Sequence, residues 1–179
     1  MNSFLLFFAV LTVTVAALYD IRSRKIPNFI TYPSMAISLV YCSLVDGMQG
    51  FAFSAGGLIL GVTFFLIPYI LGGMGAGDAK LMGALGATLG PGGLVNAALI
   101  IALAGGVYAV VLLIINRAYC KEFIKRSFFV LRTFAVTRQI NPVPVIGQDR
   151  PVLCYGLAIA LGTILYVSLS LGGYNRWIV

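Results

Sequence analysis

The chain has 179 residues, of which 60% are hydrophobic and only 9% are charged, and its formal net charge is +7. Soluble domains carry about 25% charged residues, so this composition excludes a soluble globular protein and indicates an integral membrane protein. Histidine is absent, which excludes Ser-His and Cys-His catalysis and the usual histidine-containing zinc sites. The cysteines form no CxxC pair, so neither a disulfide framework nor a thiolate metal site is expected. No cofactor is expected.

Six apolar stretches are predicted to form membrane helices, each needing roughly 20 apolar residues to span. They cover residues 3–19, 29–45, 51–71, 79–89, 94–115 and 151–171. The fourth is short, because residues 79–89 at about 1.5 Å each reach only about 17 Å. Residues 1–179 are therefore predicted to form a single all-α transmembrane domain of six helices.

Turn and linker residues separate the predicted helices. A charged linker, residues 20–28, ends the first helix, and Asp46-Gly47 and Gly90-Pro91 mark two further breaks. The longest polar region, residues 116–150, contains a mixed apolar and basic segment at 121–136 that suits a cytoplasmic amphipathic helix lying on the membrane surface. An ordinary linker along the membrane would show the same pattern.

The positions of the basic residues predict the orientation. All except Arg176 fall after the first, third and fifth predicted helices. Because positive residues favour the cytoplasmic side, these loops are expected in the cytoplasm and both termini outside. The basic charge is thus explained by topology and by the lipid bilayer as a partner, and no nucleic-acid partner is expected.

Three of the five acidic residues have ordinary explanations. Asp46 precedes a glycine in a short outer turn, where aspartate is common for structural reasons. Glu122 has a helix-spaced partner in Arg126, and Asp149 lies beside Arg150 in a proline-rich loop.

Asp20 and Asp78 differ, because both lie at the cytoplasmic ends of apolar helices and the topology allows them to face each other. Taken alone, Asp20 could pair with Arg22 or Arg24, and Asp78 could cap a helix or pair with Lys80. However, a carboxylate on a glycine-rich turn at membrane depth is costly and typically marks function.

Two carboxylates a few Å apart cannot both ionise cheaply, so they share one proton. The charged group can take a proton from a water that attacks a peptide carbonyl. The neutral group can donate a hydrogen bond to the developing oxyanion. The pair therefore predicts peptide hydrolysis without a metal.

The motifs around these residues resemble those of the type IV prepilin peptidases, membrane aspartyl proteases of the GxGD type. Residues 75–80, Gly-Ala-Gly-Asp-Ala-Lys, resemble the family signature. Asp20 followed by Ile-Pro-Asn at 26–28 resembles its first catalytic motif, and residues 151–162 resemble the proline-rich start of its last helix.

This resemblance implies that Asp20 and Asp78 are the catalytic pair, and that prepilins or pseudopilins lose a short leader at the cytoplasmic face of the bacterial inner membrane. Larger members of the family carry a cysteine-rich insertion and a methyltransferase activity. The short linker here resembles the peptidase-only kind associated with Flp-type (Tad) pili. The expected substrate-binding or supporting residues are Gly75, Gly77, Lys80, Pro27 and Asn28.

Two other functions remain open from the sequence. The chain could be a non-enzymatic membrane transport or pilus-assembly component in which Asp78 is an ion or proton site, although no inverted repeat is evident. It could also be an intramembrane protease related to presenilin or a preflagellin peptidase. The oligomeric state is not indicated.

Overall fold

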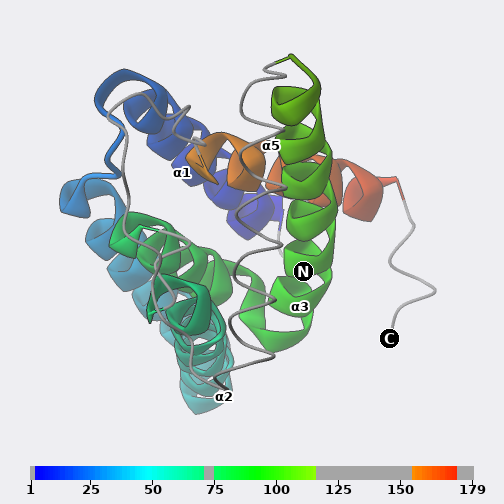
Figure 1. Cartoon of the computed structure of the whole chain (residues 1–179). Coiled ribbons are helices and arrows are strands. Elements are labelled where there is room, and N and C mark those ends of the chain that lie inside the picture. Colours follow the sequence, from blue (N-terminus) through cyan, green and yellow to red (C-terminus); the bar gives the residue numbers. More distant parts are fainter. Residues whose placement is uncertain (1–2, 71–74, 116–154, 173–179) are drawn as a thin grey trace, which may run out of the picture. The chain divides into compact units, whose positions relative to one another are not determined.

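The computed structural model describes residues 3–70, 75–115 and 155–172, and these form four helices (Figure 1). They are α1 (Ser3–Ser23), α2 (Asn28–Ile70), α3 (Ala76–Ile115) and α5 (Tyr155–Leu171). The prediction of an all-helical protein is therefore confirmed for these ranges. The predicted surface helix at residues 121–136 lies outside them.

The predicted count of six spanning helices is not supported. Among the described residues, α1, α2 and α3 are long and apolar enough to cross a membrane, whereas α5 is a shorter apolar helix. The difference arises because two pairs of predicted helices each follow one another without an intervening loop, so each pair forms one long helix with a break inside it. The segments expected at 29–45 and 51–71 are joined within α2, and those expected at 79–89 and 94–115 are joined within α3.

Both predicted turns nevertheless appear as breaks in these long helices. Gly47 has φ 60° and ψ −137°, and Gly90 has φ 70° and ψ 177°, in the left-handed region of φ that glycine adopts at no steric cost. Gly50 lies directly against the carbonyl oxygen of Cys42, although these positions would be about 12 Å apart along a straight helix. The chain therefore turns back on itself at Gly47.

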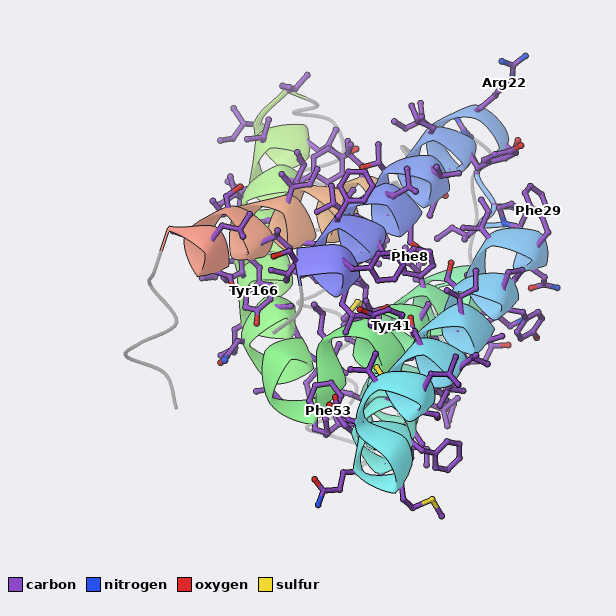
Figure 2. The ribbon with its side chains drawn as sticks, turned by 180° about the vertical axis from the view of Figure 1, so that it is seen from behind. Phe8, Arg22, Phe29, Tyr41, Phe53 and Tyr166 are labelled. Atoms are coloured by element: carbon purple, nitrogen blue, oxygen red, sulfur yellow. The ribbon has the colours of Figure 1, made fainter. Side chains whose placement is uncertain are left out.

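Aromatic contacts align α1 with the first part of α2 in antiparallel fashion. The rings of Phe4 and Tyr41 stack with centroids 4.6 Å apart near one end. At the other end, Tyr19 meets Phe29 edge-on at 5.4 Å, and Figure 2 shows the aromatic residues Phe8 and Tyr41 between the two helices. This pairing places the end of α1 next to the start of α2.

Residues 78–90 of α3 form the centre of the bundle, since all of them except the half-buried Lys80 are buried. Leu81 and Met82 are fully enclosed, and they belong to one apolar core that includes Val13 of α1 and Ile159 of α5. A helical segment too short for a bilayer core is thus accommodated because other helices, rather than lipid, surround it.

Glycines allow α2 to approach this central segment closely. A Cβ atom on Gly57 would overlap the carbonyl oxygen of Gly86, and a Cβ on Gly86 would overlap that of Gly57. Small residues permit such backbone contact between apolar helices. Hydroxyl groups add to the contact, because Ser54 Oγ donates to the carbonyl oxygen of Ala87 at 2.7 Å.

Replacing Gly86 by Val should therefore destabilise the protein by about 1–3 kcal/mol, the usual cost of overpacking a core. The measurement is the thermal unfolding midpoint in detergent. Gly92→Ala is the matched control, because a Cβ at Gly92 meets no atom of the described residues within 4 Å. An unchanged midpoint for Gly86→Val would contradict the close backbone contact.

Candidate functional site

The structure brings the two predicted aspartates together. Asp20 lies in the last turn of α1 and Asp78 in the first turn of α3. Each residue is only 8% exposed, and the two carboxyl groups are close enough for their charges to interact. Buried carboxyl groups need hydrogen-bond partners, so the donors around each are informative.

The start of α3 supplies the partner of Asp78. The N–H of Gly75, the residue before α3, donates to Asp78 Oδ2 at 3.1 Å. The N–H of Asp78 donates in return to the Gly75 carbonyl oxygen at 3.1 Å. This reciprocal pair resembles a capping box, in which an acidic side chain three positions into a helix reaches back to the capping residue. Asp78 thus caps α3 from within its first turn.

The start of α5 supplies the partner of Asp20. The N–H of Gly156 donates to Asp20 Oδ2 at 3.0 Å. Arg22, one of the two partners considered from the sequence, is exposed and points away from the helices (Figure 2). The N–H of Arg24 donates to the backbone carbonyl oxygen of Asp20 at 2.8 Å, and Arg24 itself has φ 51°, which ends α1.

Sequence reasoning missed Gly156 as a member of this site. The only signal was its place in residues 151–162, the segment that resembles the start of the family's last helix. A glycine has no side-chain chemistry to attract notice, and its contact with Asp20 joins opposite ends of the chain.

The linker after α1 contacts the glycine-rich turn before Asp78. A Cβ on Gly77 would lie 3.0 Å from Ile26 Cβ and 3.4 Å from the Ile26 nitrogen. The neighbouring Pro27 accepts a hydrogen bond from the Ile30 N–H at 3.1 Å, at the start of α2. The absence of a side chain at Gly77 therefore lets the two predicted motifs meet.

Lys80 joins the same two motifs through its side chain. Its Nζ donates to Asn28 Oδ1 at 2.9 Å and lies 5.0 Å from the ring centroid of Tyr32, a cation–π distance. Tyr32 was not predicted, although its position four residues after Asn28 puts it on the same helical face. All seven predicted site residues thus lie at or beside this junction.

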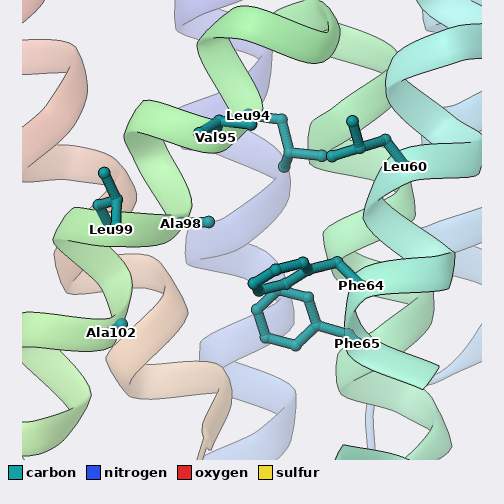
Figure 3. Close-up of a pocket in the computed structure, with 8 residues that line it drawn as sticks. All are labelled: Leu60, Phe64, Phe65, Leu94, Val95, Ala98, Leu99 and Ala102. Atoms are coloured by element: carbon teal, nitrogen blue, oxygen red, sulfur yellow. The ribbon is translucent and has the colours of Figure 1, made fainter. Parts of the chain in front are cut away.

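An apolar cavity of about 250 Å³ lies elsewhere, between the second half of α2 and the part of α3 that follows Gly90 (Figure 3). Its lining includes Phe64 and Phe65 of α2 and Leu94 and Ala98 of α3. None of the predicted site residues lines it. It is therefore separate from the aspartate pair.

The site chemistry is that of two buried carboxyl groups. In the part of the chain that the structure describes, no group of three His, Cys, Asp or Glu side chains is placed to hold a metal ion. What Asp20 and Asp78 can do together is accept, share and donate protons at a position shielded by apolar helices.

Comparison with known families gives a match that includes both aspartates. The profile of the type IV leader peptidase family matches residues 6–110, more than half of the chain. The chain matches no curated protein and no solved structure. The resemblance drawn from the two motifs is thereby confirmed, and the chain belongs to the type IV leader peptidase family.

Proposed function

We propose that the protein is an aspartyl endopeptidase that removes the short N-terminal leader of Flp/Tad-like type IV prepilins. The observation that carries this proposal is the pair of buried aspartates, Asp20 and Asp78, each held by a backbone N–H. Membership of the leader peptidase family supports prepilins as the substrate class.

The hydrogen bonds suggest how the pair would act. In both carboxyl groups Oδ2 accepts a backbone N–H, from Gly75 for Asp78 and from Gly156 for Asp20. No hydrogen bond from a described residue reaches either Oδ1 atom. We assign the Oδ1 atoms to water and to the scissile carbonyl. One carboxylate removes a proton as the water oxygen attacks the carbonyl carbon, and the protonated partner donates a hydrogen bond to the oxyanion. Collapse of that intermediate breaks the C–N bond, and the leaving nitrogen takes a proton from the pair.

The same proposal places the site at the cytoplasmic face of the bacterial inner membrane, with the termini outside. The basic loop residues support this orientation. Six crossings are compatible with the breaks in α2 and α3. Without the reversal at Gly47, α2 would be about 65 Å long, twice a hydrocarbon core of about 30 Å. We propose that each break separates two crossings.

We further propose that Gly75, Gly77, Pro27, Asn28 and Lys80 support the aspartates rather than perform the reaction. Lys80 and Gly77 join the two motif segments through Asn28 and Ile26, and Gly75 holds Asp78 within its own segment. They would fix the separation of the carboxyl groups, and small errors in such positioning are costly to catalysis.

The first test replaces each aspartate by asparagine and measures cleavage of a purified Flp-type prepilin in detergent. Asp20→Asn and Asp78→Asn should each lower the rate at least about 100-fold, because each removes an acid–base group. Asp46→Asn is the control, since Asp46 is an exposed acid beside the break at Gly47. Unfolding midpoints verify folding. Retained cleavage by folded Asp78→Asn would overturn the two-aspartate mechanism.

A second prediction concerns the glycines before Asp78. Gly77→Val should reduce cleavage strongly, because its side chain would displace Ile26 and the linker that follows Asp20. Gly75→Ala should have a smaller effect, since among the described residues its Cβ would meet Asp78 Oδ2, at 3.3 Å, and one backbone nitrogen at 4.0 Å. Equal activity of Gly77→Val and the wild type would show that the contact with Ile26 is dispensable.

A third prediction concerns Lys80. Lys80→Met keeps the aliphatic stem but removes the bond to Asn28 and the cation over Tyr32, so cleavage should fall by about 3- to 10-fold, the kinetic equivalent of about 1 kcal/mol. Lys80→Arg should restore most of the loss, because it can make both contacts. Lys25→Met, at an exposed cation of the linker, is the control. If Lys25→Met lost as much activity as Lys80→Met, general surface charge would be the cause.

A further inference from the structure

The first turn of α5 reaches the carboxyl group of Asp20 through Gly156. Besides the hydrogen bond from its N–H, Gly156 leaves no room for a side chain. A Cβ at this position would lie 2.8 Å from Asp20 Oδ2, 2.9 Å from its Cβ and 3.1 Å from its Cγ. Any other residue would therefore have to push the Asp20 side chain away.

This requirement for glycine is one of space. The glycines with positive φ are Gly47 and Gly90 among the described residues, so backbone strain does not explain glycine at 156. The requirement also centres on Asp20, because the three nearest atoms of the described residues all belong to it. Among the described residues, Asp20 is thus the nearest obstacle to a side chain at position 156.

The position of Gly156 in its helix explains the hydrogen bond. It is the second residue of α5, and the first N–H groups of a helix have no partner within the helix. They carry partial positive charge that favours a carboxylate. Because α1 packs along α5 (Figure 2), docking of these helices brings that free N–H to Asp20.

We propose that Gly156 is a positioning residue for Asp20, which makes α5 part of the active site. The proposal rests on the proposed function, and it extends the site beyond residues 6–110, where the family match lies. By holding Oδ2, Gly156 sets the direction in which Oδ1 of Asp20 faces water and substrate. A shift of about 1 Å in such a group can cost about 100-fold in rate.

The test compares three glycine-to-alanine variants in cleavage of a purified Flp-type prepilin. Gly156→Ala should lower kcat about 10- to 100-fold with KM within about twofold of wild type, because substrate binding is untouched. Gly105→Ala should behave as wild type, since in the described part of the chain its Cβ meets Ala158 Cβ at an ordinary 3.7 Å. Gly162→Ala should lower the unfolding midpoint but keep kcat per folded molecule, because its Cβ would strike Ile101 Cα at 2.5 Å, away from the aspartates.

The outcomes separate this inference from the proposed function. Failure of the wild type to cleave any prepilin would reject the function itself. Cleavage by the wild type with equal kcat in Gly156→Ala would reject the positioning role alone. A change in KM with kcat intact would also reject it.

A second measurement does not depend on activity. Asp20→Gly removes the three atoms nearest to a Cβ at residue 156, so the alanine should fit better in that background. The loss of unfolding midpoint caused by Gly156→Ala should then be smaller in Asp20→Gly than in the wild type, a coupling that a double-mutant cycle detects. The same comparison applies if Gly156→Ala folds poorly by itself. Additive losses would overturn the proposal.

Discussion

Two carboxyl groups are buried at the ends of apolar helices, Asp20 in the last turn of α1 and Asp78 in the first turn of α3. Hydrogen bonds from the surrounding backbone offset the cost of removing these groups from water. An ion loses several kcal/mol of hydration on burial unless hydrogen bonds replace the water. Asp78 receives the N–H of Gly75, and Asp20 receives that of Gly156. Both donors are unused N–H groups at the beginning of a helix. The first turns of α3 and α5 are therefore held by the same kind of interaction, a hydrogen bond from a backbone N–H to a buried carboxyl group.

The remaining contacts make that convergence geometrically possible. Gly57 and Gly86 let α2 and α3 touch along their backbones, while Gly77 lets the turn before Asp78 meet Ile26. None of these contacts supplies a catalytic group. They are possible because glycine has no side chain, which explains why glycine recurs at the helix interfaces nearest the site. Lys80 then adds a polar connection between the segments that follow Asp20 and Asp78.

The sequence allowed the breaks at Gly47 and Gly90 to be predicted, because glycine next to aspartate or proline interrupts an apolar run in a recognisable way. It also allowed Asp20 and Asp78 to be paired, because the predicted topology places both at the same side of the membrane. The count of six spans failed as a description of the helices, since a single glycine reverses the chain without a loop. Gly156 could not be found, because it contacts Asp20 through a backbone N–H and through the absence of a side chain. Periodicity and motif spacing register neither.

The docking of α5 on α1 has a consequence for how the protein is made. Of the described helices, α5 is synthesised last, yet its N–H completes the surroundings of an aspartate on the helix synthesised first. Until α5 is synthesised and packs on α1, Asp20 lacks the hydrogen bond from the Gly156 N–H and the close contact that restricts its carboxyl group. On the proposed function, a partly synthesised chain would hold both aspartates and still be inert, so proteolytic activity would begin only when the membrane bundle closes.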